Sequence, residues 1–177
     1  MEDDEADAEK AVNAYNTLKD NGMKVFIGTV TTGACLSVIS QTKADNMFQI
    51  TPSASAAKVI ANDNCFQVCF TDPNQGTASA DYIASKGLAK KVGVIYNSSD
   101  AYSSGVYDNF KAEAAAKGLD LVASEAFTGD SKQDFSSQLS KIKASGAELI
   151  FLPIYYQEAS LILSPAKTAG ITAKFFG

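Results

Sequence analysis

Two patterns of apolar and polar positions alternate along the chain, one typical of helices and one typical of buried strands. Helix-patterned stretches end in a lysine-containing turn and a glycine, and a short β-favouring run follows each of them, as in "AEAAAKG" before "LDLVASEAF". Glycine is favoured just after a helix, where the backbone takes positive φ, and lysine is favoured near the negative helix end. This repetition predicts alternating helices and strands. The glycines of the five units are Gly22, Gly87, Gly118, Gly146 and Gly170.

Continuous apolar runs mark the predicted strands and indicate that they are parallel. The runs are "VFIG", "FQIT", "VGVIY" and "LIFLP", and such uninterrupted strands are typical of parallel sheets with helices on both faces. On the first predicted helix, Ala11, Tyr15 and Leu18 share one face. The pattern therefore predicts an α/β fold with doubly wound parallel sheets. One local conflict is Pro165, which is expected to kink or split its helix.

Composition and charge exclude several classes of function. With 177 residues and 46% apolar content, the chain can form one domain or two small lobes with buried cores. A net charge of −5, with 15 basic residues scattered among 20 acidic ones, argues against nucleic acid or an anionic membrane as partner. Because histidine is absent, the usual catalytic triads and histidine-bearing zinc sites cannot form. This absence removes most hydrolase hypotheses, and we expect no enzyme activity, no metal and no cofactor.

The three cysteines are expected to be reduced and to act as small buried hydrophobic residues. A period of two places Cys65 and Cys69 on one face of a strand, roughly 13 Å apart at the strand rise. That separation is too large for a disulfide. Cys35 lies elsewhere in the sequence, and no histidine is present to complete a metal site with these thiols.

The sequence leaves the cellular location of the protein open. No run reaches the roughly 18 consecutive apolar residues that a membrane span needs. The opening "MEDDEADAEK" is unlike a basic-then-apolar signal peptide. Two alternatives follow: a cytoplasmic protein, or an export signal that lies outside these residues.

The loops that follow the predicted strands are rich in hydroxyls and glycine. They read "TVTTGA", "TPSASAA", "NSSDAYSSG", "TGDSKQD" and "PIYYQE". In open α/β sheets, ligands bind beyond the carboxyl ends of the strands. Hydroxyls and backbone N–H groups at a helix start hold a carboxylate or phosphate without cationic side chains. For a single loop, helix capping is the simpler interpretation, but several such loops at one sheet edge favour a ligand.

The ligand that these loops favour is a small carboxylate such as an amino acid. The glycine pattern of dinucleotide-binding folds is absent, and "GTVTTG" has no lysine after its second glycine, so it is not a P-loop. Tyr102, Tyr155 and Tyr156 are candidates for the wall of an apolar pocket. Ordinary packing at a helix start is the alternative role for Tyr156.

Seven segments, in their order along essentially the whole chain, resemble a known family. They include "DDEADAEKAVNAYNTL", "VFIGTVTTGACLSVI", "ITPSASAA" and "DFSSQLSKIKASGAELIFLPIYYQEA". The chain is similar to the branched-chain amino-acid substrate-binding proteins of ABC transporters, which have the type I periplasmic binding fold. The resemblance implies two doubly wound lobes joined by a hinge, an amino-acid ligand bound between them, and delivery of that ligand to a membrane permease. The alternative is a ligand-sensing domain of a receptor or transcription regulator with the same fold.

The resemblance also assigns ligand contacts. "TVTTG" resembles the loop whose hydroxyl and backbone amides bind the ligand carboxylate, a role that falls on Thr32. "TPSAS" resembles the loop that offers a backbone carbonyl to the ligand ammonium and a hydroxyl to its carboxylate. Two tyrosines match those that close over the ligand, and one aspartate matches an acidic position at the crossing between lobes. The expected ligand-binding residues are Val30, Thr31, Thr32, Ser53, Ala54, Ser55, Asp72, Tyr102 and Tyr155.

Segments of the family pattern are missing at both ends. The family has a strand, a helix and a strand before the "DD" segment, and a glycine-rich loop with an acidic residue after "FFG". We therefore expect a fragment, truncated at both ends, with residues 1–71 as part of lobe one and residues 72–177 as most of lobe two. Its parent is expected to be periplasmic or a cell-surface lipoprotein. The missing first strand leaves residues 25–27 at an open edge, which predicts a homodimer.

Overall fold

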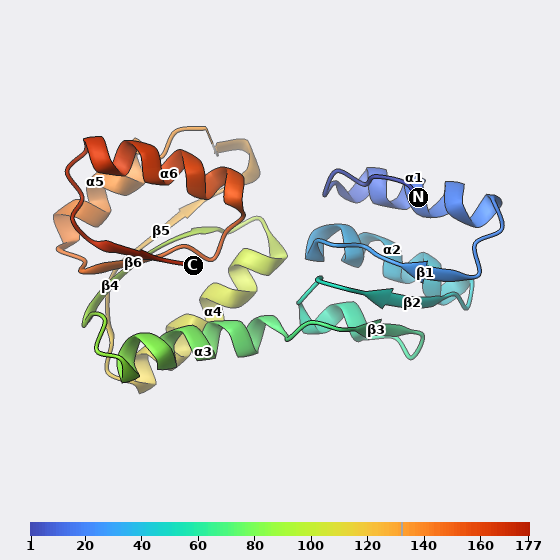
Figure 1. Cartoon of the computed structure of the whole chain (residues 1–177), viewed down its shortest axis with the longest axis horizontal. Coiled ribbons are helices and arrows are strands. Elements are labelled where there is room, and N and C mark those ends of the chain that lie inside the picture. Colours follow the sequence, from blue (N-terminus) through green and yellow to red (C-terminus); the bar gives the residue numbers. More distant parts are fainter. Residues whose placement is uncertain (132) are drawn as a thin grey trace. The chain divides into compact units, whose positions relative to one another are not determined.

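The computed structural model describes residues 1–131 and 133–177. The chain divides into two compact units, Met1–Asp72 and Pro73–Gly177, and each has its own parallel sheet (Figure 1). The elements of the first unit are α1 (Ala8–Asp20), β1 (Val25–Ile27), α2 (Thr32–Ala44), β2 (Phe48–Thr51), the 3-10 helix η1 (Ala57–Ile60) and β3 (Cys65–Gln67). Those that follow are α3 (Asp72–Ser85), β4 (Lys91–Asn97), α4 (Ala101–Ala116), β5 (Asp120–Phe127), η2 (Gly129–Ser131), α5 (Ser136–Ser145), β6 (Leu149–Phe151), α6 (Tyr156–Thr168) and β7 (Lys174–Phe176).

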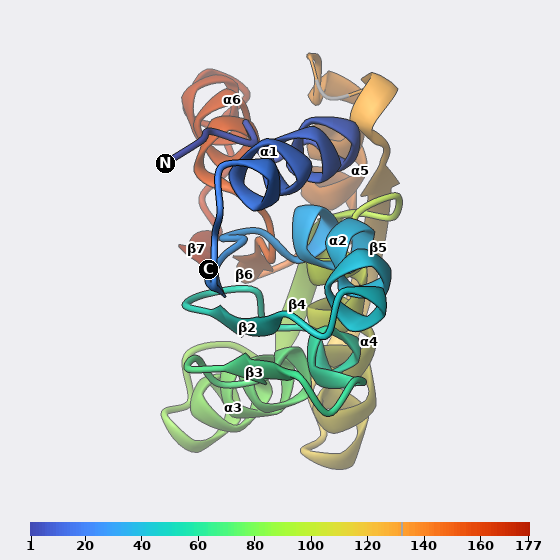
Figure 2. The same cartoon turned by 90° about the vertical axis from the view of Figure 1, so that its right-hand side faces the viewer.

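The first unit has a three-stranded parallel sheet in the order β1-β2-β3. Its core lies on one face of this sheet, where Phe26 of β1 packs with Ala11 and Tyr15 of α1 and with Val38 of α2. The predicted first helix is confirmed, and Asp7 caps it by accepting hydrogen bonds from the backbone N–H groups of residues 9 and 10. Figure 2 shows α2 beside one face of β2 and β3. No helix of the described first unit packs on the opposite face, although the apolar strands predict cover on both.

The second unit is doubly wound, as the apolar strands predict. Its sheet has the order β5-β4-β6-β7, and all its pairings are parallel. Val94 of β4 packs with Phe110 of α4 on one face, and Ile95 packs with Ile142 of α5 and Ile162 of α6 on the other. Neighbouring residues of one strand are thus buried on opposite faces, so the fold class is confirmed here.

Helix ends follow the glycine pattern of the sequence. All five glycines of the repeated units have positive φ, as predicted. Gly146, with φ of 70°, follows α5, and its N–H donates to the carbonyl of Lys143. A residue with a Cβ would be strained in this left-handed region, which is why glycine stands there.

The helix that contains Pro165 is not split. The helix α6 runs unbroken from residue 156 to residue 168. Proline removes one backbone donor, but Ile162 and Ala166 are fully buried on both sides of it, and this packing offsets the loss of one hydrogen bond. Of the two predicted outcomes, a kink or a split, the split is therefore wrong.

All three cysteines are free thiols, as predicted, but only Cys35 and Cys65 are buried, and Cys69 is half-buried. Burial raises the pKa of Cys35 to about 11, because an apolar surrounding disfavours the thiolate. Cys69, however, lies beyond β3, which ends at Gln67. The partner strand β2 ends at Thr51, which pairs with Gln67, so no residue of β2 is available to pair with the chain at Cys69. The prediction that Cys65 and Cys69 share one strand was therefore wrong.

Candidate functional site

Two hydroxyl-rich loops of the first unit are tied together by Thr32, the first residue of α2. Its side-chain oxygen accepts hydrogen bonds from the backbone N–H groups of Ser55, at 3.1 Å, and Ala56, at 3.4 Å. Thr32 is only 1% exposed. The loops "TVTTG" and "TPSAS", more than 20 residues apart in sequence, therefore meet at the carboxyl ends of β1 and β2.

Buried polar side chains fix these loops from the sheet side. The Thr51 hydroxyl donates to the carbonyl of Thr29 at 2.6 Å and accepts from the N–H of Ala54 at 3.0 Å. Gln49 donates from its side-chain nitrogen to the carbonyl of Gly28 at 3.2 Å. Both loops are thus held in one conformation by hydrogen bonds from β2, which is what a preorganised binding site requires.

The hydroxyl of Thr31 takes no part in these hydrogen bonds between the loops and the sheet. Thr31 stands at the N-cap position of α2, yet its side chain makes no capping hydrogen bond. Its Oγ1 atom is buried and has no hydrogen-bond partner among the described residues. The N-terminal amides of a helix carry a partial positive charge and bind anions. The hydroxyl and the amides together make this end of α2 suited to a small carboxylate.

The other predicted residues of the first unit differ in their exposure. Val30 is 59% exposed, and Ser53 is also exposed, whereas Ala54 and Ser55 are buried. Asp72 is buried, and its N–H donates to the carbonyl of Ser55 at 2.9 Å. The structure therefore brings Asp72 to the "TPSAS" loop.

Tyr102 and Tyr155 meet in the second unit. Their rings stack with centroids 5.2 Å apart and an interplanar angle of 24°, and Gln75 donates to the Tyr102 hydroxyl at 3.0 Å. Both tyrosines follow the carboxyl ends of strands, Tyr102 after β4 and Tyr155 after β6. Tyr156 is 79% exposed and instead lines a cavity of about 290 Å³ with Gln133 and Leu161.

Two acidic residues near these tyrosines were missed at the sequence level. Asp100 caps α4 by accepting from the N–H of Ser103 at 2.8 Å. Burial raises the pKa of Asp100, and the negative charge of Glu158 raises it further. Glu158 is itself buried in the first turn of α6. Both residues lie in the segments that follow apolar strands, "NSSDAYSSG" and "PIYYQE", and that position was the available signal.

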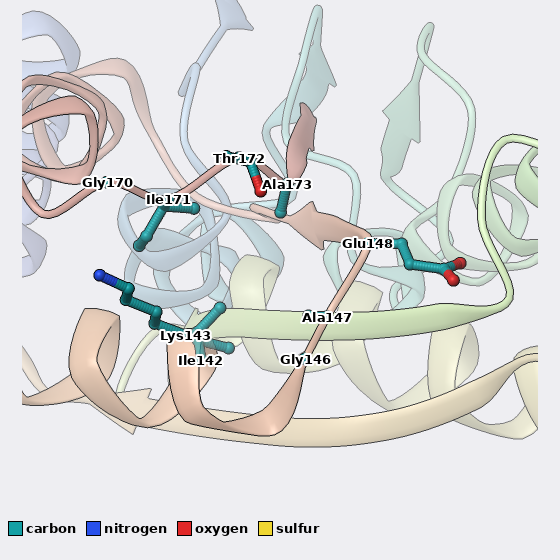
Figure 3. Close-up of a pocket in the computed structure, with 9 residues that line it drawn as sticks. All are labelled: Ile142, Lys143, Gly146, Ala147, Glu148, Gly170, Ile171, Thr172 and Ala173. Atoms are coloured by element: carbon teal, nitrogen blue, oxygen red, sulfur yellow. The ribbon is translucent and has the colours of Figure 1, made fainter.

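The cavity of about 490 Å³ shown in Figure 3 contains none of the predicted residues. It lies at the amino ends of β6 and β7, opposite the edge that carries Tyr155. Lys143, in its wall, donates to the carbonyl of Ala169 at 2.7 Å. Glu148 points away from Lys143 in Figure 3 and accepts from the N–H of Lys90. Both charged side chains of this cavity are thus already bound to backbone groups of the protein.

Two general findings bear on the class of site. In the part of the chain that the structure describes, no three acidic or thiol side chains gather as metal ligands. Across the same residues, no helix combines the length and apolar character needed to cross a membrane.

The fold and its loops define the class of this protein. It is an α/β protein with parallel sheets, and in this class small molecules bind at the carboxyl ends of the strands. A family model described as "Periplasmic binding protein" matches residues 1–177. The chain therefore belongs to the periplasmic binding protein family.

Curated relatives and solved structures agree with this assignment. "Leu/Ile/Val-binding protein homolog 3" of Brucella melitensis is 32% identical over 99% of this chain and 48% of the relative. Leucine binding protein LivK of Thermotoga maritima matches with a TM-score of 0.90 and 26% identity, over 98% of this chain and 49% of that one. LivJ of Streptococcus pneumoniae, a branched-chain amino acid transporter substrate-binding protein solved with isoleucine, has a TM-score of 0.89, 26% identity and the same coverage. The chain thus spans about half the length of the curated relatives it matches.

Proposed function

We propose that this chain is part of the solute-binding component of an ABC importer, which binds a branched-chain or similar amino acid for delivery to a membrane permease. The observation that carries the proposal is the similarity of nearly the whole chain to LivJ, whose structure was solved with isoleucine. The name of the Brucella melitensis relative, a Leu/Ile/Val-binding protein homologue, supports the same proposal. These names favour a transport component over a ligand-sensing domain. We also propose a binding role without enzyme activity, and a periplasmic or cell-surface lipoprotein parent.

We infer that the ligand carboxylate binds at the start of α2. The buried, unpartnered Thr31 hydroxyl and the helix amides support this assignment. Thr32 acts mainly by positioning, because its oxygen already holds the "TPSAS" loop. We propose Ser53 and Ser55 as further contacts to the ligand. Contacts through Val30, Ala54, Asp72, Tyr102 and Tyr155 are likewise proposed from the family resemblance.

Replacement of Thr31 by valine tests the carboxylate site. Valine keeps the shape of threonine but removes the hydroxyl, so binding of leucine, isoleucine or valine is expected to weaken by about 1.5–3 kcal/mol, roughly 10- to 100-fold in Kd. Isothermal titration calorimetry on the 177-residue chain measures this change. Thr17→Val is the matched control, because Thr17 is exposed on α1 and bonds only within that helix.

Two results would contradict the proposal at different levels. If none of the three amino acids binds the chain, residues 1–177 do not carry the proposed binding function. If an amino acid binds and Thr31→Val leaves its affinity unchanged, the function stands and the carboxylate assignment fails.

We further propose that the chain self-associates as a homodimer. The strand β1 is an edge strand of the first sheet. Val25 is 51% exposed and Ile27 is 74% exposed. Apolar edge strands with unpaired backbone groups recruit a second chain, and a two-fold dimer is the commonest closed arrangement.

A further inference from the structure

The backbone of Ala54, in the "TPSAS" loop, is held from two strands at once. Its N–H donates to the hydroxyl of Thr51, the last residue of β2, at 3.0 Å. Its carbonyl accepts from the side-chain nitrogen of Gln67, the last residue of β3, at 3.1 Å. The strands β2 and β3 are neighbours in the first sheet, and Thr51 pairs with Gln67 in their register (Figure 1). Two adjacent side chains therefore hold both backbone groups of Ala54.

The carbonyl groups of this loop differ in whether they are already bonded. The carbonyl of Ala54 accepts from Gln67, and the carbonyl of Ser55 accepts from the N–H of Asp72 at 2.9 Å. The carbonyl of Ser53 accepts no hydrogen bond from the residues that the structure describes. The loop is expected to offer one backbone carbonyl to the ligand ammonium, and the geometry leaves that role to Ser53.

The other end of the Gln67 amide is not used. Its side-chain oxygen is buried and has no hydrogen-bond partner within residues 1–131 and 133–177. A buried acceptor without a partner lowers stability, because it has lost its hydrogen bonds to water. A leucine side chain of similar size would fill the position without this loss. What glutamine adds is the donor that holds Ala54, so the choice of residue favours loop positioning over stability.

A second donor reaches the Ala54 carbonyl but is weaker. The Cys69 thiol donates to it at 3.5 Å, and thiols are weak hydrogen-bond donors. The Gln67 side-chain nitrogen also lies 3.7 Å from the Cys69 sulfur. Without the Gln67 amide, the Ala54 carbonyl would keep only the weak thiol donor.

We propose that Gln67 is a positioning residue for ligand binding. By holding the Ala54 carbonyl, it fixes the loop in the conformation in which the Ser53 carbonyl can accept from the ligand ammonium. Polar groups that are held in the bound arrangement beforehand give higher affinity, because less conformational freedom is lost on binding. The inference rests on the proposed amino-acid binding, and it adds a residue of β3 to a site expected only from loops.

Gln67→Leu tests the inference, because it removes the donor and keeps the size of the side chain. Calorimetric titration of the 177-residue chain with the amino acid leucine is expected to show a Kd about tenfold weaker. The urea midpoint is expected to stay nearly unchanged, because the unpartnered oxygen is removed together with the hydrogen bond. Loss of affinity without loss of stability is a result that a merely structural role would not give.

Gln138→Leu is the matched control. Gln138 on α5 has the same two features, since its side-chain nitrogen donates to the carbonyl of Ala126 at 3.4 Å and its oxygen is buried without a partner in the described chain. Ala126 lies within β5 and outside the hydroxyl-rich loops. Gln138→Leu should therefore leave the Kd for leucine unchanged.

Amide hydrogen exchange measures the loop directly, without a ligand. The N–H groups of Ala54 and Ser55 donate to the hydroxyl oxygens of Thr51 and Thr32, and they exchange slowly as long as the loop keeps these bonds. In Gln67→Leu both amides are expected to exchange several-fold faster, while the amides of α4 in the second unit keep their rates.

The outcomes separate the inference from the proposed function. If leucine binds the wild-type chain and Gln67→Leu leaves its Kd unchanged, the inference fails and the proposed function stands. Unchanged exchange of the Ala54 and Ser55 amides would also overturn the inference, and so would a loss of affinity that is accompanied by an equal loss of stability. If the wild-type chain binds none of leucine, isoleucine and valine, the proposed function itself fails, and the role of Gln67 in binding fails with it.

Discussion

Gly76→Ala is expected to destabilise the second unit by about 3 kcal/mol or more. A Cβ at residue 76 would lie 2.5 Å from the backbone oxygen of Val106 and 2.8 Å from the backbone nitrogen of Phe110. Val106 and Phe110 are fully buried, so α4 cannot shift without breaking the core that it forms with β4. Glycine at residue 76 therefore lets α3 and α4 pack with their backbones in close approach. Urea unfolding followed by circular dichroism measures the change.

Gly33→Ala is the control for this prediction. Gly33 lies within α2, and nothing comes within 4 Å of a Cβ built there. Alanine at an unobstructed helix position is expected to stabilise the protein by about 0.5–1 kcal/mol. Opposite signs for the two glycines would support the close approach of α3 and α4. An unchanged unfolding midpoint for Gly76→Ala would show that the two helices do not approach as described.

Gln49→Leu is expected to destabilise the first unit by about 2–4 kcal/mol, because leucine fills the same space and leaves buried polar groups without partners. Gln49 is 1% exposed. Its side-chain oxygen accepts from the Thr42 hydroxyl at 2.8 Å, and its nitrogen donates to the carbonyl of Gly28 at 3.2 Å. The same urea titration reports the loss, since the first unit contributes its own helices to the signal.

The Thr42 hydroxyl also donates to the carbonyl of Ile39 at 3.2 Å, so the main group that loses its partner in Gln49→Leu is the carbonyl of Gly28. Gln157→Leu is the matched control, because Gln157 is exposed and its only described side-chain bond, to the Tyr156 hydroxyl, measures 3.4 Å. It should change stability by less than about 0.5 kcal/mol. If Gln49→Leu behaves like this control, the buried network does not stabilise the unit.

The hydroxyl-rich loops could be located from the sequence, but their geometry could not. The position of "TVTTG" after an apolar run is enough to place it at the end of β1. That the Thr32 oxygen is already bound by the Ser55 and Ala56 amides depends on where β2 lies beside β1. The unpartnered hydroxyl therefore falls on Thr31, and the roles of the nine expected ligand-binding residues stay predictions.

The sequence by itself determined the order and type of the elements, because these depend on interactions over a few residues. A glycine such as Gly146 ends a helix through its own φ angle, and an apolar run such as residues 149–151 forms the next strand. It also determined the family, because the matched segments keep their order over residues 1–177.

Only the tertiary structure decided which of these apolar surfaces are buried. The runs "VFI" and "VGVIY" read alike, yet β4 is covered on both faces and β1 on one, since burial depends on helices supplied by distant segments. The length of β3 was decided by where its partner β2 ends, and the continuity of α6 through Pro165 by packing on both sides of the proline. Each of these outcomes follows from contacts between residues far apart in the chain, which no local pattern specifies.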